Sequence, residues 1–377
     1  MFMLRSTILR LSGAVLLIFT TLFISSCDEA GWSPVAIDDD EDETTDNRRF
    51  FGPGSVWELT LDDDDSFALT RKTAIDSESA ELEILGTYNI LDSGFTRLTV
   101  SEPAVNVPTT IAALDIADYA VLLMPPESTN NQLVATITSG TCSSASVSGN
   151  WIQYKFSSTA DTSADDQYFF GTWRYDPAID FFHTYDEYNV GEFVKNSAGG
   201  GSATSEGCDE GLASNETDSQ FVSANASIVS IDEDDSQINT FRFGLPEDRI
   251  VSAANFDGDY VGFMYDTDSD SSGTIAASCN AGECELYSVS DIANVEREEA
   301  NKTHTLALGE TPDLPEDGFI TGTLTDLIDD SDNNPGNIAC MVNMDINNSE
   351  KHLLSCVGQY PSEATGEAVN IFLYSDT

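Results

Sequence analysis

Three aspartates at alternate positions, Asp266, Asp268 and Asp270, form the best candidate for a metal site in this sequence. Alternate carboxylates on a tight loop suit Ca²⁺, which takes about six to eight oxygen ligands. The sixth position of the loop is Ser271, where an EF-type loop needs glycine, and the twelfth is Ala277, which replaces the bidentate acid. Two interpretations stay open: a calcium site, and a solvated acidic hairpin turn. The turn is favoured because acids are frequent throughout the chain.

Aromatic and acidic side chains are interleaved in a second stretch. Its aromatic members are Tyr168, Phe169, Phe170, Trp173, Tyr175, Phe181, Phe182, Tyr185 and Tyr188. Aromatic faces stack on sugar rings, and carboxylates accept hydrogen bonds from sugar hydroxyls. The residues that we select as candidates for glycan contacts are Trp173, Tyr175, Tyr185, Asp186 and Glu187. The competing interpretation, which we favour, is that alternate aromatics pack a β core, since Tyr and Phe are common in strands.

Other catalytic signatures are missing. The chain has three histidines, His183, His304 and His352, and contains neither HExxH nor GxSxG. No glycine-rich phosphate loop occurs, and the sequence calls for no cofactor other than the open calcium candidate. A glycan hydrolase with two carboxylates stays open, because its catalytic pair can lie far apart in sequence.

Six cysteines form an even set, as expected for disulfides in an exported protein. They are Cys142, Cys208, Cys279, Cys284, Cys340 and Cys356. Cys340 and Cys356 lie symmetrically about the polar stretch 347–350, which is the spacing of a cross-strand bridge in a hairpin. Cys279 and Cys284 enclose a turn-like tetrapeptide. Spacing does not choose strictly among the possible pairings.

The pairing of Cys142 with Cys208 then follows by elimination. That bridge would close a long loop and contribute about 4 kcal/mol if it is unstrained. A zinc site is the weaker alternative for these cysteines, because no paired CxxC spacing is present.

A seventh cysteine, Cys27, ends the N-terminal stretch of the chain. Arg5 and Arg10 give this stretch a positive start, and an apolar run leads to Ile24-Ser25-Ser26 immediately before Cys27. A branched aliphatic residue, two small residues and cysteine are the pattern of a lipobox, so the stretch resembles the signal peptides of bacterial lipoproteins.

The resemblance covers residues 1–27 only. It implies that residues 1–26 are a signal peptide and that Cys27 becomes the lipidated N-terminus, which would anchor the protein in the bacterial cell envelope. The apolar run of about fourteen residues is shorter than the roughly twenty that a spanning helix needs. An ordinary secretory signal with an incidental Cys27 is the alternative. Asp28 follows the pattern of inner-membrane lipoproteins in enteric bacteria, but this rule varies, so the membrane and leaflet stay open.

Charge sets limits on partners. The chain has 66 acidic and 15 basic residues, for a formal net charge of −51. Such a surface repels phosphate backbones and anionic lipid headgroups, which excludes nucleic-acid binding and leaves the acyl group as the membrane attachment. The acidity is explained most simply by a solvated surface suited to high salt.

The mature chain divides by composition. Residues 27–52 contain an acidic run that self-repels, and we expect them to form a tether. Residues 53–245 and 246–377 are expected to be two β domains, with a junction at Leu245-Pro246.

Short alternating runs dominate both expected domains. Trp57, Leu59 and Leu61 alternate with polar residues, and similar runs recur between clusters of Ser, Asp, Gly and Pro. This pattern predicts a mainly β protein of antiparallel sandwich or barrel modules. Short helices are expected over 107–117 and 291–300.

The function that the sequence favours is that of a lipid-anchored binding or structural protein of the cell envelope, without enzymatic activity. Its partner would be a glycan or an envelope protein, and its oligomeric state is open. The alternative is an envelope glycan hydrolase that uses a carboxylate pair.

Overall fold

A computed structural model describes the protein over most of its length beyond residue 46. The described residues are 47–52, 57–72, 80–103, 107–116, 120–123, 134–138, 147–155, 169–176, 181–191, 193–195, 202–204, 208–209, 212–214, 219–222, 228–234, 237–246, 257–266, 271–309, 319–328, 335–344, 351–360 and 368–376.

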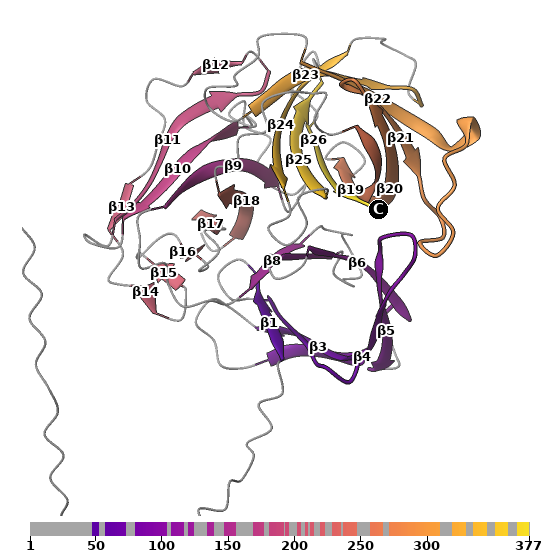
Figure 1. Ribbon diagram of the computed structural model, residues 1–377. Coiled ribbons are helices and arrows are strands. Elements are labelled where there is room, and N and C mark those ends of the chain that lie inside the picture. Colours follow the sequence, from indigo (N-terminus) through magenta and orange to yellow (C-terminus); the bar gives the residue numbers. More distant parts are fainter. Residues whose placement is uncertain are drawn as a thin grey trace, which may run out of the picture. The chain divides into compact units, whose positions relative to one another are not determined.

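The first eight strands close into a barrel, here named barrel 1, in which β1 pairs with both β2 and β8 (Figure 1). Its strands are β1 (Arg48–Phe51), β2 (Trp57–Leu61), β3 (Ser66–Lys72), β4 (Ala80–Ile90), β5 (Thr96–Glu102), β6 (Thr110–Ile116), β7 (Ala120–Leu123) and β8 (Val134–Thr138). Each strand pairs antiparallel with its neighbour in the sequence, so the barrel is an up-and-down meander.

The next ten strands form an open sheet, in which β9 lies between β10 and β18. Its strands are β9 (Val147–Lys155), β10 (Phe169–Asp176), β11 (Phe181–Asn189), β12 (Val194–Lys195), β13 (Ser202–Thr204), β14 (Cys208–Asp209), β15 (Leu212–Ser214), β16 (Ser219–Val222), β17 (Ile228–Asp234) and β18 (Gln237–Pro246). Its outermost strands β12 and β14 are only two residues long, and short strands of this kind limit unwanted edge pairing.

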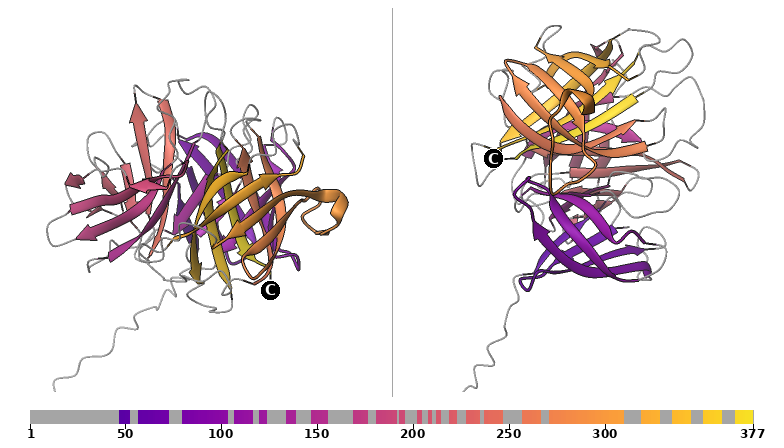
Figure 2. Two further views of the ribbon diagram at one scale, coloured as in Figure 1. Left: turned by 90° about the horizontal axis from the view of Figure 1, so that it is seen from above. Right: turned by 90° about the vertical axis from the view of Figure 1, so that its right-hand side faces the viewer.

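The last eight strands close into barrel 2, where β19 pairs with both β20 and β26. Its strands are β19 (Gly258–Asp266), β20 (Ser271–Asn280), β21 (Glu283–Ser288), β22 (Lys302–Leu308), β23 (Phe319–Asp326), β24 (Gly336–Met344), β25 (His352–Gln359) and β26 (Ala368–Ser375), and a single 3₁₀ turn, η3 (Glu299–Asn301), precedes β22. Figure 2 shows the strands crossing the barrel walls obliquely, as closure of a sheet requires.

The prediction of a mainly antiparallel β protein with barrel modules is confirmed. The helices predicted over 107–117 and 291–300 are wrong: the first region contains β6, and the second is turn and irregular structure that ends in η3. In β6, Ile111 faces the interior of barrel 1, and Leu114 faces outward into the core that barrel 1 shares with the open sheet and barrel 2. Because both faces of the strand are buried, its apolar run is continuous and imitates a helical pattern.

The interior of barrel 1 is filled by apolar side chains from alternate positions. They are Phe50, Trp57, Leu59, Leu61, Phe67, Leu69, Ile84, Leu98, Ile111, Ala113, Val121 and Leu123. Burial of each large side chain contributes about 1.5–3 kcal/mol, so this interior is the main source of the barrel's stability.

The strand β1 lies within residues 27–52, which the charge pattern assigned to a tether. Phe50 is fully buried in barrel 1, and Arg48 on the same side of the strand pairs with an acid across the barrel. Residues 48–51 therefore belong to barrel 1, and a tether over the residues before them stays a prediction.

The interior of barrel 2 follows the same alternation. It contains Tyr260, Met264, Ile275, Ala277, Cys279, Cys284, Leu286, Leu306, Leu308, Ile320, Leu324, Ile338, Cys340, Val342, Leu354, Cys356, Val369, Ile371 and Leu373. Gly262 and Gly322 carry no side chain at positions where a Cβ would come within 2.0 Å of a neighbouring strand's carbonyl oxygen. Close strand contact at these two positions therefore requires glycine.

A third core joins the outward faces of both barrels to the open sheet. Phe95 of barrel 1 meets Phe263 of barrel 2 edge-on, with ring centroids 6.0 Å apart. Phe170 of the open sheet meets Phe319 of barrel 2 at 4.7 Å in a similar geometry. Aromatic pairs of this kind contribute about 0.5–1.5 kcal/mol beyond their burial. The three sheets therefore share one hydrophobic core.

Candidate functional site

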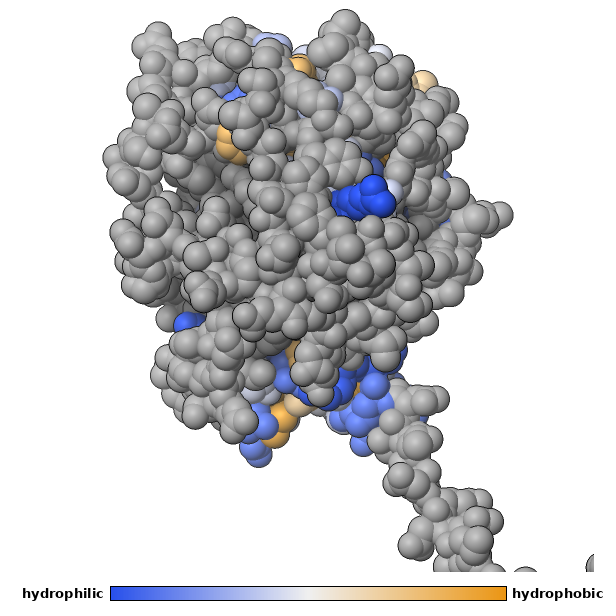
Figure 3. Space-filling model, turned by 90° about the vertical axis from the view of Figure 1, so that its left-hand side faces the viewer, coloured by the Kyte–Doolittle hydropathy of each residue, from blue (hydrophilic) through white to orange (hydrophobic). Residues whose placement is uncertain are grey.

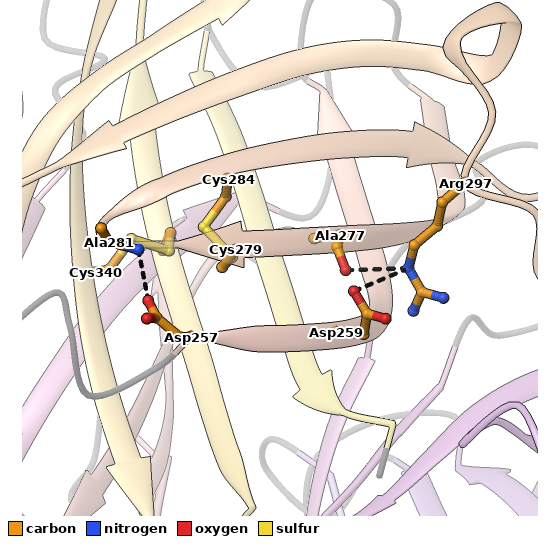
Figure 4. The surroundings of a disulfide bond; sticks show 9 residues. Asp257, Asp259, Ala277, Cys279, Ala281, Cys284, Arg297 and Cys340 are labelled. Atoms are coloured by element: carbon orange, nitrogen blue, oxygen red, sulfur yellow. Dashed lines mark hydrogen bonds and ion pairs between the residues drawn. A yellow bond between two sulfur atoms is a disulfide. The ribbon is translucent and has the colours of Figure 1, made fainter.

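Two disulfides lie on the inward face of barrel 2 (Figure 4). Cys279 of β20 is directly opposite Cys284 of β21, and Cys340 of β24 is directly opposite Cys356 of β25, each with Cα atoms 4.1 Å apart. Both bridges that the spacing suggested are therefore present. Neither Cys142 nor the side chain of Cys208 belongs to the described part of the chain, so their pairing stays a prediction.

The first bridge staples a tight turn whose backbone is strained. Ala281 and Gly282 connect β20 to β21 with φ values of 53° and 89°, so both are left-handed. This is the geometry of a two-residue hairpin turn, for which Asn-Gly is the preferred pair. Ala281 tolerates it poorly because its Cβ crowds the backbone. The carboxylate of Asp257 compensates by accepting the Ala281 N–H bond at 2.6 Å (Figure 4).

One arginine holds together the ends of several barrel 2 strands. The Arg297 guanidinium donates to the carbonyl oxygens of Tyr260 at 3.0 Å and Ala277 at 3.2 Å, and it also binds the Asp376 carboxylate. Asp259 Oδ1 lies 3.8 Å from the same group (Figure 4). Since Tyr260 belongs to β19 and Asp376 follows β26, Arg297 clamps the seam where the first and last strands of the barrel meet.

A second polar group lies beside this clamp. The Tyr287 hydroxyl donates to Glu285 Oε2 at 2.6 Å, and Lys302 binds the other oxygen of the same carboxylate. The bond from Lys302 lowers the pKa of Glu285, and the bond to Glu285 raises the pKa of Tyr287 to about 12. Burial raises the pKa of Tyr260, so both tyrosines stay protonated well above neutral pH.

Barrel 1 has a polar cluster at one end of its interior. Arg48 of β1 donates two parallel hydrogen bonds to Asp115 of β6, at 3.0 and 2.7 Å. Burial lowers the pKa of Arg48, but its bonds to Asp115 and Tyr88 outweigh burial and leave the pKa above its usual value. Tyr88 also donates to the carbonyl of Asp62 at 3.2 Å. This bidentate pair joins strands that are not neighbours in the barrel.

His304 of β22 faces the interior of barrel 2. The residue is 6% exposed and lies on the same side of the strand as Leu306. Its Nε2 lies 3.9 Å from Oδ1 of Asp326, the residue directly opposite on β23. That distance is too long for a hydrogen bond, so these two atoms do not form a bonded acid–base dyad.

Among the five candidates for glycan contacts, the structure describes the side chain of Trp173. Trp173 is fully buried, and its indole lies against Gly149 on the neighbouring strand, where a Cβ would come within 2.5 Å of Nε1. Trp151 lies opposite Gly171 in the same strand pair and is also fully buried. These two Trp–Gly pairs pack a core, so Trp173 offers no face to a sugar.

The remaining glycan candidates lie on two paired strands. Tyr175 belongs to β10, and Tyr185, Asp186 and Glu187 belong to β11. Their side chains are outside the described part of the structure. Contact of these residues with a glycan stays a prediction.

The calcium candidate is only partly described. Asp266 ends β19 directly opposite Ser271 of β20, so the acidic stretch between them connects a hairpin. Asp268 and Asp270 lie outside the described residues. In the part that is described, no group of three His, Cys, Asp or Glu side chains is placed to hold a metal ion. A calcium site on this hairpin stays a prediction.

A comparable acidic turn is described between β2 and β3. Ser66 Oγ donates to Asp62 at 3.0 Å, and Ser66 N donates to Asp64 Oδ1 at 3.0 Å. The bonds from Ser66 hold the pKa of Asp64 below its usual value. The side chain and the backbone of Ser66 therefore supply donors to two carboxylates of this acidic hairpin turn.

The described surface is mainly hydrophilic. In the face drawn in Figure 3, the coloured surface residues are mostly blue, with small orange patches between them. The exposed large hydrophobic residues of the described chain are Ile90, Leu327 and Ile328. Within the same residues, no helix has the length and apolar character to span a lipid bilayer.

The residues that sequence reasoning missed are Arg48, Asp115 and Arg297. For the two arginines the sequence signal is scarcity, because the chain has only 15 basic residues beside 66 acids, whereas nothing in the sequence marks Asp115. Their partners could not be read from spacing, since Arg48 and Asp115 are 67 positions apart and Arg297 and Asp376 are 79 apart.

Comparison with known proteins adds little. No family model matches the chain, and no curated protein matches it. Among solved structures, the chain is similar to the crystal structure of isotype 1 transferrin-binding protein B from serogroup B Neisseria meningitidis, with 8% sequence identity and a TM-score of 0.27. The match covers 85% of this chain and 65% of that chain. A likeness at this level leaves function to be argued from the chain's own residues.

Proposed function

We propose that the protein is a lipid-anchored protein of the bacterial cell envelope, held at a membrane through Cys27. The observation that carries the proposal is the order Ile24-Ser25-Ser26-Cys27 after a positive start and an apolar run. The two disulfides of barrel 2 support it, because such bonds persist in oxidising compartments outside the cytoplasm.

The anchored part acts as a binding or structural module. Both barrel interiors are filled with apolar side chains, and the open sheet shares a core with both barrels. A framework of this kind is rigid and presents its outer strands and loops to partners. Partners of the module are an envelope glycan or an envelope protein.

The anchor is tested by cell fractionation of two variants. Cys27→Ala removes the lipidated residue, so the protein should move from the membrane fraction to the soluble fraction. Ser25→Ala keeps a small residue at its position and should stay with the membrane, which makes it the matched control. If Cys27→Ala stays in the membrane fraction after a high-salt wash, lipidation is not the anchor.

We propose that a glycan binds at β11, the strand that contains Tyr185, Asp186 and Glu187. Its outer edge pairs with β13 at Phe181–His183 and with β12 at Tyr188–Asn189. No described strand covers the edge of residues 184–187, which include Tyr185, Asp186 and Glu187. A ligand approaching this gap would meet the backbone polar groups of the strand edge.

Binding of purified envelope glycan to the mature protein tests this proposal. Asp186→Asn with Glu187→Gln should weaken binding at least about tenfold if these carboxylates accept hydrogen bonds from sugar hydroxyls. Glu296→Gln with Glu298→Gln changes the net charge equally at exposed positions of barrel 2 and should leave binding unchanged. Equal weakening by both pairs would mean that only overall charge matters.

A further inference from the structure

The Cys340–Cys356 bridge lies at the centre of a long hairpin inside barrel 2. Strands β24 and β25 pair from Asn337 opposite Gln359 to Met344 opposite His352, and the bridge joins the fourth of these eight pairs. Both cysteines are 0% exposed and face the apolar interior. Neither end of the hairpin can fray far enough to uncover this bridge while the barrel stays closed.

The Cys279–Cys284 bridge has a different position. It is separated from the two-residue turn at Ala281 and Gly282 by one further residue pair. Cys279 is 4% and Cys284 is 1% exposed, and Asn280, Ala281 and Glu283 beside the bridge are exposed at the surface. Opening of this short, strained turn, together with the adjoining ends of β19 and β22 that pair with Cys279 and Cys284, would uncover the bridge while the rest of the barrel stays closed. The two bridges lie on opposite sides of the barrel, since β20–β21 and β24–β25 are separated by two strands in each direction.

Because the two bridges differ in position, they should also differ in their rates of thiol–disulfide exchange. A thiolate must reach one sulfur and displace the other, so the reaction depends on access to the bridge. A closed eight-stranded wall blocks that approach to Cys340 and Cys356. We propose that the Cys340–Cys356 bridge must form before barrel 2 closes. Thiol reagents then reach this bridge only when the barrel unfolds.

The proposal places an oxidation step before folding is complete. The thiols of Cys340 and Cys356 together give up two electrons and two protons as the bridge forms. The electrons pass to a disulfide-bearing oxidant, which becomes a dithiol, through a mixed disulfide with one cysteine. That oxidant must act on the open β24–β25 hairpin. Cys279–Cys284 can form or be remade later, because its turn stays accessible.

The test measures reduction of each bridge in the intact mature protein across a urea series. Dithiothreitol is the reductant: its first thiolate forms a mixed disulfide, and its second thiol closes a ring and releases the other cysteine. Quenched samples are alkylated, and mass spectrometry gives a separate rate for each cysteine pair. Unfolding is followed in parallel by circular dichroism.

The two rates should depend differently on urea. The rate at which Cys340–Cys356 is reduced should increase with urea as steeply as the unfolding equilibrium constant does. The reason is that the step that opens this bridge exposes the surface of the whole barrel. Reduction of Cys279–Cys284 should show a weak urea dependence and be at least about tenfold faster in the absence of urea. In fully denaturing urea the two rates should converge, which controls for intrinsic reactivity.

A core variant gives a second readout. Ile338→Val removes one buried methylene from β24 and should speed reduction of Cys340–Cys356 about fivefold in dilute urea, with little effect on Cys279–Cys284. The proposal is overturned if Cys340–Cys356 is reduced with a weak urea dependence, or as fast as Cys279–Cys284 without urea. Either result would mean that reagents enter the closed barrel.

Discussion

Barrel 1 and barrel 2 share one topology but are held closed by different chemistry. Among the described residues, the closing seam of barrel 1 has two paired positions, Phe50 opposite Thr138 and Phe51 opposite Ile137. The closing seam of barrel 2 has seven, from Tyr260 opposite Ser375 onward. Barrel 1, whose described seam is the shorter, has the Arg48–Asp115 ion pair across its interior.

The ion pair of barrel 1 and the disulfides of barrel 2 also differ in the strands that they join. Arg48 and Asp115 join β1 to β6, strands that do not pair, so this contact exists only when barrel 1 is closed. Each disulfide of barrel 2 joins neighbouring strands and can form in an isolated hairpin. Covalent staples therefore stabilise hairpins in barrel 2, and the seam is left to strand pairing and the Arg297 clamp. In barrel 1, a polar contact supports the closure itself.

The largest effect is expected from the disulfides. Replacing Cys340 and Cys356 by Ala opens a 16-residue loop in the unfolded chain and should lower the free energy of unfolding by about 3 kcal/mol. Replacing Cys279 and Cys284 by Ala releases a loop of only five residues and should cost about 2 kcal/mol. Urea unfolding of the mature protein measures both. Equal losses would show that the loop entropy of the unfolded chain does not set the difference.

The next effect tests the ion pair of barrel 1. Asp115→Asn leaves the Arg48 guanidinium without its carboxylate at a mostly buried position and should destabilise the protein by about 2 kcal/mol. Hydrogen exchange should quicken first in β1, because this strand carries Arg48 and forms the closing seam of the barrel.

A double variant is the control for that prediction. Arg48→Met with Asp115→Leu removes both charges together and should restore most of the stability, because no buried charge is left unpaired. If the double variant is as unstable as Asp115→Asn, the pair stabilises the barrel through its packing and not through its charges.

A smaller and opposite effect is expected at the strained turn of barrel 2. Ala281→Gly removes the Cβ that crowds a left-handed backbone and should raise the free energy of unfolding by about 1 kcal/mol. Asp257→Ala removes the acceptor of the Ala281 N–H and should lower it by about 1 kcal/mol. Thermal unfolding measures both changes. A destabilising Ala281→Gly would contradict the strain assigned to this turn.

The two barrels also show how far sequence reasoning reaches. The hairpins were predictable, because β2 and β3 or Cys340 and Cys356 are close in sequence and their alternation or spacing is visible. The strand β6 was not, since burial on both faces makes its apolar run continuous.

Long-range features were outside the reach of the sequence for a different reason. The contacts of Arg48 with Asp115 and of Arg297 with Asp376 depend on how each barrel closes, and closure leaves no local signal. The burial of Trp173 likewise depends on Gly149 of a neighbouring strand. Side chains that alternate along a strand reveal which face is buried, but they do not reveal what covers it.

The smallest effect concerns alkaline pH and again distinguishes barrel 2. Its bond to Glu285 raises the pKa of Tyr287 to about 12, whereas an unfolded tyrosine titrates near about 10. Folding therefore favours the protonated hydroxyl, and the stability that this bond contributes is fully present below about pH 10 and is lost as pH rises through about 12. Tyr287→Phe keeps the buried ring and removes the hydroxyl, so it should flatten the fall in unfolding free energy over this window. Ultraviolet absorbance of phenolate should also show one fewer late-titrating tyrosine, with Tyr260 still titrating late because burial raises its pKa. An unchanged alkaline profile in Tyr287→Phe would show that the Glu285 bond does not hold the proton.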